Sequence, residues 1–176
     1  GLGNLTVHIG EKLGYADEKI SSGCVQELIE REYDPLSVML IENPDSAGFV
    51  VTHGLEDDAF ERDEVPMTKE EIRSISLSKL RLPQGAVAYD VGSGSGSVSV
   101  EMAMQAFRGT VYAIEMKDNA VALTQKNKEK FSLMNLEVIH GKAPEALNDL
   151  PAPTHAFIGG SSGSMKGIID CLLKKN

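Results

Sequence analysis

The stretch that most constrains the fold is AVAYDVGSGSG, residues 86–96. It begins as an apolar run interrupted only by Asp90, continues with glycine at every second position, and leads into an apolar-periodic segment from Val98. A strand, a glycine loop and a helix in this order open a binding crevice at the carboxyl end of a strand in an α/β sheet. Glycine lets the backbone turn sharply and a ligand approach closely. The N–H groups at the start of the following helix favour an electron-rich ligand group.

The spacing of the glycines separates two classes of ligand. The dinucleotide fingerprint G-x-G-x-x-G is incomplete, because Ser97 occupies the third glycine position. The pattern D-x-G-x-G-x-G instead resembles the first motif of methyltransferases that use S-adenosylmethionine (SAM). The next predicted strand, residues 110–115, ends in Glu115, which could accept hydrogen bonds from the ribose hydroxyls of SAM or of NAD. A structural alternative is that the glycines only form a tight turn capped by Asp90.

Composition limits the class of protein. A chain of 176 residues has room for one or two small domains, and 41% hydrophobic residues predict a packed core. The net charge of −9 disfavours non-specific binding to nucleic acid or to acidic membranes. No apolar run is long enough to cross a bilayer, and no signal peptide is visible. We expect neither a nucleic-acid nor a membrane partner, and a cytoplasmic location.

Cysteine and histidine give no sign of a metal site. Cys24 and Cys171 lie far apart and the four histidines are scattered, which does not match the spacing of metal ligands. We expect both cysteines to fill space on helices rather than to carry chemistry.

The first 43 residues predict a strand, a helix and a strand. Residues 5–9 form the first expected strand, and Ser21 or Ser22 caps a helix that continues to Tyr33. The nearly continuous apolar run over residues 36–41 predicts a buried strand. These elements are too few to bury a core of their own, so we expect residues 1–43 to be the end of a longer domain. Residues 44–65, rich in turns and acids, are the expected linker, with the acids solvated.

Residues 66–176 form the expected second domain. Thr68 and Glu71 have the spacing of a capping box, and Ile72, Ile75 and Leu80 form the apolar stripe of the helix that follows. Predicted strands over 86–91, 110–115, 136–140 and 154–158 alternate with helices over 97–107 and 119–131, and a last helix begins near Met165. This alternation predicts a parallel sheet with right-handed crossovers. Because a sheet that stops at its fourth strand leaves an edge unpaired, we expect this domain to be incomplete as well.

Several segments together resemble one family. VPMTKEEIR, DVGSGSGSVSVE, AIE, GKAPEAL and FIGGSSG, in this order, resemble the precorrin methyltransferases of cobalamin biosynthesis, and in particular their decarboxylating C15-methylating unit. VHIGEKLGYADEKI and LSVMLIEN resemble the end of the C5-methylating unit, which is fused ahead of the other unit in some members. The resemblance implies a class I SAM-methyltransferase with a Rossmann-like, incomplete parallel sheet. A strand-helix-strand tail of a tetrapyrrole-methylase domain precedes it.

The resemblance also implies roles for particular residues. The glycine loop would hold the methionine part of SAM, Glu115 its ribose and Ala143 its adenine, while Gly159 and Gly160 face the tetrapyrrole. The implied cofactor-binding residues are Thr68, Asp90, Gly92, Ser93, Gly94, Ser95, Gly96, Glu115 and Ala143, and the implied substrate-binding residues are Gly159, Gly160 and Lys69. A structural reading remains for two of these positions: Thr68 as a helix cap, and Gly159-Gly160 as a turn.

The expected reaction asks little of side chains. The methyl group of SAM is already activated on a sulfonium, so catalysis comes mainly from alignment and desolvation. The conjugated macrocycle can accept the electrons released by loss of carbon dioxide from a ring acetate. The sequence assigns no residue to the accompanying proton transfers, and hence no catalytic residue. Candidate cations for the substrate carboxylates are Lys69, Arg73, Lys142 and Lys166, whose alternative role is that of solvated surface charges.

Three other functions are compatible with the same sequence. A methyltransferase acting on another small molecule or on protein would use the same core. A nucleotide-dependent dehydrogenase would bind NAD, and a scaffold would leave the glycine loop without a ligand. We expect a homo-oligomer that acts on a precorrin. Because both units look cut, we expect weak or no activity from these 176 residues alone.

Overall fold

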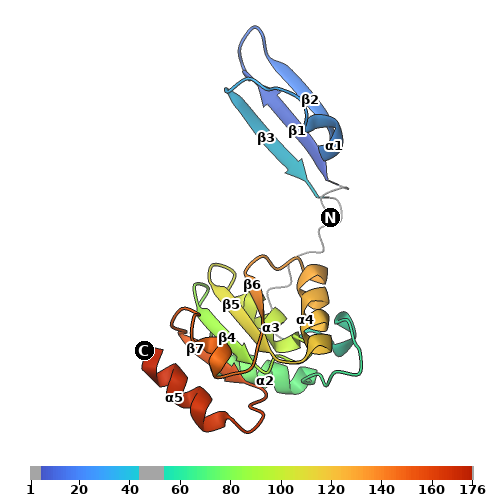
Figure 1. Ribbon diagram of the computed structural model, residues 1–176. Coiled ribbons are helices and arrows are strands. Elements are labelled where there is room, and N and C mark those ends of the chain that lie inside the picture. The colour runs from blue at the N-terminus through green and yellow to red at the C-terminus, as the bar shows by residue number, and fades with distance from the viewer. Residues whose placement is uncertain (1–4, 44–53, 176) are drawn as a thin grey trace. The chain divides into compact units, whose positions relative to one another are not determined.

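The computed structural model describes residues 5–43 and 54–175. Contacts between Cα atoms divide the chain into two units, residues 1–50 and 51–176 (Figure 1). Each unit has its own sheet, and each is described by itself below.

The first unit is a three-stranded antiparallel sheet in the order β2-β1-β3. Its elements are β1 (Thr6–Glu11), β2 (Lys19–Cys24), the one-turn helix α1 (Val25–Leu28) and β3 (Ser37–Glu42). The predicted helix from Ser21 or Ser22 to Tyr33 is present only as the single turn α1, so the prediction was wrong in its start and its length. Residues 19–24 pair with β1 as a strand, and Ser22 Oγ lies 2.8 Å from Nδ1 of His8 on the neighbouring strand. Cross-strand pairing therefore overrides the helical spacing of the apolar residues.

The prediction that residues 36–41 form a buried strand was also wrong in part. They do contribute a strand, β3, but every residue of β3 is exposed, including Val38 at 60% and Leu40 at 61%. The reason is its position: β3 pairs with β1 at one edge of the sheet. Among the described residues of this unit, the buried hydrophobic cluster consists of Val7, Ile9 and Leu28.

The second unit is built on four parallel strands in the order β6-β5-β4-β7. The strands are β4 (Val87–Val91), β5 (Thr110–Glu115), β6 (Leu136–His140) and β7 (His155–Ile158). The helices are α2 (Glu70–Leu80), α3 (Ser97–Gln105), α4 (Asp118–Lys130) and α5 (Met165–Lys175), with the 3₁₀ turns η2 (Asp57–Ala59) and η3 (Glu145–Leu147). The predicted α/β class and parallel sheet are confirmed.

The sheet of this unit is covered on both faces. Leu77 of α2 and Val98, Val100 and Met102 of α3 pack with Ala88 in one cluster. Ile168 of α5 and Leu147 of η3 pack with Tyr89 and Val91 in another. Neighbouring residues of a strand point to opposite faces, so Ala88 and Tyr89 serve different clusters and both are fully buried. This double coverage explains why the central strand is an almost unbroken apolar run.

Helix α2 is rotated relative to the prediction. Ile72 and Ile75 are 57% and 59% exposed, whereas Arg73 and Leu77 are buried. The predicted capping box does not form either, because Lys69 is the N-cap and no side chain caps the helix. The partners of Arg73, described below, fix the inward face. Apolar spacing could not reveal this, because the buried residue is an arginine.

The described part of the expected linker, residues 54–65, is more ordered than predicted. Phe60 is 3% exposed and its ring centroid lies 5.3 Å from that of Phe131. Asp57 forms an ion pair with Arg73 at 2.8 Å rather than only facing solvent. Within residues 5–43 and 54–175, no helix has the length and apolar character needed to cross a membrane.

Candidate cofactor and substrate site

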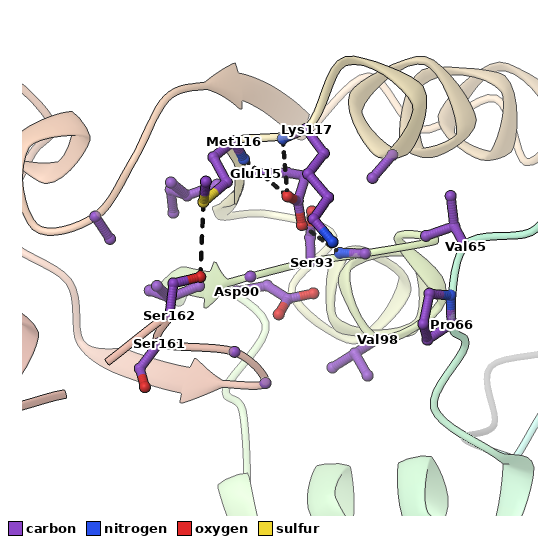
Figure 2. A pocket seen from close by; sticks show the side chains of 18 of the residues that line it. Val65, Pro66, Asp90, Ser93, Val98, Glu115, Met116, Lys117, Ser161 and Ser162 are labelled. Carbon is purple, nitrogen blue, oxygen red and sulfur yellow. Dashed lines mark hydrogen bonds between the residues drawn. The ribbon is translucent and has the colours of Figure 1, made fainter. Parts of the chain in front are cut away.

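A cavity of about 460 Å³ opens at the carboxyl ends of β4, β5, β6 and β7 (Figure 2). The loops that follow the four strands form most of its wall, and residues 64–68 close one side. Figure 2 shows Val65 and Pro66 on one side of the cavity and Ser161 and Ser162 on the other. This is where an open α/β sheet binds ligands, because the loops after parallel strands meet at that edge.

The glycine loop has a backbone that other residues adopt only with strain. Gly92, Gly94 and Gly96 have φ values of 73°, 57° and 76°, in the left-handed region that favours glycine. A Cβ on Gly92 would lie 2.6–2.8 Å from backbone atoms of Gly160, and one on Gly96 would lie 2.7 Å from Thr124 Cγ2. The alternating glycines are therefore needed both for the turn and for close packing against the loop after β7 and against helix α4.

Glu115 ends β5 beside this loop and is 8% exposed. Its carboxylate accepts three backbone hydrogen bonds: from Gly94 N–H at 3.0 Å, Met116 N–H at 2.8 Å and Lys117 N–H at 3.0 Å (Figure 2). A carboxylate has about four acceptor positions. At least one position therefore remains for a ligand hydroxyl, as the predicted ribose role requires.

Asp90 is the second acid of the cavity and is 1% exposed. Ser99 Oγ donates a hydrogen bond to Oδ2 at 2.5 Å, while Oδ1 has no hydrogen-bond partner among the residues that the structure describes. Burial, together with the nearby charge of Glu115, raises the pKa of Asp90 to about 6, against the opposing effect of the Ser99 hydrogen bonds. A buried acceptor without a partner is costly, so this oxygen suits a ligand that brings a donor or a positive charge.

The cavity brings together most of the predicted site. Its lining includes Thr68, Asp90, Gly92, Ser93, Gly94, Glu115, Ala143, Gly159 and Gly160. Ser95, Gly96 and Lys69 are not part of that lining. Gly96 is the N-cap of α3, the carbonyl of Ser95 accepts a hydrogen bond from Asn127, and Lys69 pairs with Asp57 at 3.1 Å. The assignment of each residue to a particular ligand group stays a prediction.

The four candidate cations are now distinguishable. Arg73 is fully buried in ion pairs and faces no ligand, while Lys69 and Lys166 pair with Asp57 and Asp170. Lys142 is exposed and lines the cavity. Lys142 is thus the member of the set that is placed to meet a substrate carboxylate.

Sequence reasoning missed part of the wall. The missed lining residues include Glu64, Val65, Pro66 and Met67 before α2, Met116, Lys117 and Asn119 after β5, and Ser161 and Ser162 after β7. The positions after Glu115 could have been inferred, because they follow an acid-ended strand beside the glycine loop. Glu64 and Val65 end the expected linker and Pro66 and Met67 begin the expected second domain, and their spacing carries no signal for a cavity wall. In the described part of the chain no cluster of three or more His, Cys, Asp or Glu residues could hold a metal ion.

Comparison with known proteins identifies the family. A model described as the precorrin methyltransferase domain matches residues 58–175. The chain is 46% identical over 127 residues to a probable cobalt-precorrin-6B C(15)-methyltransferase (decarboxylating) of Pyrobaculum calidifontis, covering 70% of this chain and 65% of that protein. It is 55% identical over 111 residues to the protein of the same description from Sulfolobus acidocaldarius, covering 61% and 58%. The chain therefore spans about three fifths of the length of these relatives.

A solved structure agrees in both sequence and fold. The crystal structure of precorrin-6Y C5,15-methyltransferase from Geobacter metallireducens superposes with a TM-score of 0.67 at 38% identity, covering 71% of this chain and 66% of that one. The matched family model covers the glycine loop, Glu115 and every strand of the parallel sheet. The chain belongs to the precorrin methyltransferase domain family.

Proposed function

We propose that this chain binds SAM in the cavity and transfers its methyl group to C15 of a precorrin, with loss of carbon dioxide from a ring acetate. The relatives' names support the reaction and the substrate class. The observation that carries the cofactor is the pair of buried carboxylates, Asp90 and Glu115, on either side of the glycine loop. The crystal structure of precorrin-6Y C5,15-methyltransferase from Geobacter metallireducens has the same fold.

The charges of the cavity favour SAM over NAD. SAM carries a sulfonium and an ammonium group against one carboxylate, so a site with two buried acids attracts it, whereas the pyrophosphate of NAD is anionic. A dinucleotide would also need free N–H groups on the loop, but the N–H of Gly94 already donates to Glu115. The unpartnered oxygen of Asp90 fits the ammonium end of the ligand.

The remaining residues would hold the rest of the cofactor. In this proposal Glu115 accepts the ribose hydroxyls and Ala143 contacts the adenine. The backbone of the glycine loop and Thr68 contact the methionine part. The bound cofactor supplies an electrophilic methyl group whose bonding electron pair stays with sulfur when the methyl leaves. The protein contributes alignment of the ring carbon with that methyl and exclusion of water.

The substrate would enter between the two sides of the cavity seen in Figure 2. Gly159 and Gly160 pack directly against the backbone of Gly92, and they carry no side chains that would keep a flat macrocycle away from this part of the cavity. Lys142 would pair with one of its carboxylates, because it is the exposed member of the four candidate cations that lines the cavity. Such pairing affects substrate affinity and orientation rather than the chemical step.

The reaction is tested with methyl-labelled SAM and a cobalt-precorrin-6B preparation, with enzyme in excess because we expect weak activity from this chain. Mass spectrometry follows both changes in one product: gain of the labelled methyl and loss of one carboxylate as carbon dioxide. A full-length curated relative is the positive control. A doubly changed product supports the proposal. It would be contradicted by label appearing on protein or on another small molecule instead.

A further inference from the structure

One wall of the cavity is formed by a segment with little regular structure. We call residues 54–69 the arm. It contains only the three-residue turn η2, yet its residues 64–68 line the cavity. A segment without a helix or strand does not fix its own path. Contacts with the rest of the domain must therefore hold the arm in place.

The first anchor of the arm is Arg73 of α2. Its guanidinium donates to Asp57 Oδ1 at 2.8 Å and to the carbonyl oxygen of Leu55. It also lies 4.6 Å from the centroid of the Phe60 ring. On its other side it donates to Glu101 Oε1 at 2.8 Å, and Glu101 Oε2 accepts from Gly54 N–H at 2.6 Å. Arg73 also donates to the carbonyl oxygen of Thr68 at 2.5 Å. This anchor therefore holds both the start of the arm and Thr68, a residue of the cavity wall.

The second anchor is Asn127 of α4, which is fully buried. Its Oδ1 accepts from the N–H of Glu61 at 2.7 Å, and its Nδ2 donates to the carbonyl oxygen of Glu61 at 3.2 Å. The same amide nitrogen donates to the carbonyl oxygen of Ser95 at 2.9 Å. One side chain thus joins the arm to the glycine loop through three hydrogen bonds to backbone.

Arm and loop also touch directly. The carbonyl oxygen of Pro66 lies 3.1 Å from the position that a Cβ on Gly94 would take. Thr124, one turn before Asn127 on α4, donates to the carbonyl oxygen of Gly94 at 3.1 Å. Helix α4 therefore holds the loop at two carbonyl groups, and the arm closes over the loop at Gly94.

We propose that Asn127 is a positioning residue of the cofactor site, which sets the glycine loop and the arm in register with one another. The inference rests on the proposed SAM site and adds a residue outside the cavity to it. Removing the two N–H donors of Asn127 frees the Ser95 carbonyl and loosens residues 61–68. The glycine loop and the arm, which both line the cavity, are then no longer held at a fixed distance from one another.

The test uses an isosteric change, Asn127→Asp, which keeps the acceptor for Glu61 N–H and removes both donors. Asn135 offers a matched control, since its Nδ2 also donates to two backbone carbonyls, those of Ala103 and Ala106, each at 2.9 Å. Asn135 is not among the residues that line the cavity. Hydrogen-exchange mass spectrometry on the ligand-free proteins follows the peptides of the arm and of the glycine loop. Calorimetry measures binding of S-adenosylhomocysteine.

For Asn127→Asp we expect faster exchange in both the arm and the glycine loop and affinity weaker by about tenfold or more. Asn135→Asp should lower thermal stability. It should leave unchanged both the exchange of these two peptides and the affinity for S-adenosylhomocysteine. Two results would overturn the inference. In Asn127→Asp the glycine-loop peptide could exchange at the wild-type rate, or the affinity for S-adenosylhomocysteine could stay within about twofold of wild type. If the wild type binds no S-adenosylhomocysteine, the proposed function fails. The exchange data then decide the role of Asn127 by themselves.

Discussion

Replacing Asp90 by asparagine should stabilise the protein in a way that depends on pH. Burial raises the pKa of Asp90 from 3.8 to about 6, so the folded protein holds this proton more tightly than the unfolded chain does. Ionisation of Asp90 therefore costs stability: the cost is absent at low pH, grows as pH rises from 3.8, and is complete above about 6. Asparagine cannot ionise and escapes this cost.

The size of the effect follows from the two pKa values. At about 1.36 kcal/mol per pH unit, the cost of ionising Asp90 has its full value of about 3 kcal/mol near pH ~7.5 and is only about 1 kcal/mol near pH ~4.5. The gain in unfolding free energy of Asp90→Asn over wild type should therefore be about 2 kcal/mol larger at the higher pH. Any constant cost of the unpartnered amide cancels in this comparison, because it is the same at both pH values.

Urea denaturation followed by far-ultraviolet circular dichroism measures the effect, since α2 to α5 all belong to the second unit. Asp149→Asn, at an exposed position, is the control and should change stability by less than about 0.5 kcal/mol at either pH. Asp90→Asn should also lose affinity for S-adenosylhomocysteine, because its free oxygen is the proposed acceptor for the ammonium group. A stability difference that does not change with pH would refute the role of burial, and unchanged affinity would refute the ligand contact.

Three further changes test other parts of the site. Gly92→Ala should destabilise the protein by about 2 kcal/mol or more, because its Cβ would lie 2.6–2.8 Å from the Gly160 backbone at a φ of 73°. Thermal denaturation compares it with Gly85→Ala, whose Cβ would meet nothing within 4 Å, and equal effects of the two changes would contradict the account. Glu115→Gln should weaken S-adenosylhomocysteine binding about tenfold or more, since an amide offers fewer acceptors to the ribose and to three N–H groups. Calorimetry compares it with the exposed control Glu137→Gln, and equal affinities of the two variants would count against this role. Lys142→Ala should raise the KM for the tetrapyrrole several-fold, because a partly exposed ion pair contributes about 1 kcal/mol, and it should leave S-adenosylhomocysteine affinity unchanged. Steady-state kinetics compare it with Lys166→Ala, and a loss confined to kcat would show a different role.

Local patterns predicted the second unit well. The expected strands at 110–115 and 136–140 have the observed bounds, and the helix expected at 119–131 is shifted by one residue. These segments combine strong periodicity with clear turn signals, so local preference and tertiary packing agree. The glycine loop stood out because its spacing reflects backbone geometry that few other residues allow, and Glu115 stood out because an acid ends the neighbouring strand.

Sequence reasoning failed where a polar residue is buried or a strand has no cover. Arg73 reads as a surface residue, yet its partners on the arm and on α3 turn it inward and expose Ile72 and Ile75. Those partners lie 16 and 28 residues away along the chain, beyond the reach of periodicity. In the first unit, the apolar run of β3 suggested burial, but a run of apolar residues reports what a strand can bury rather than what covers it. Asn127 was missed as well, because a lone asparagine on a helix carries no pattern.

The most direct test of the central claim is calorimetric titration of this chain with S-adenosylhomocysteine, with NAD as the control. The account predicts one binding event per chain for S-adenosylhomocysteine and none for NAD, because two buried carboxylates flank a loop whose Gly94 N–H is already engaged. Binding of NAD in preference, or of neither ligand by the folded chain, would contradict the assignment of the cavity to SAM.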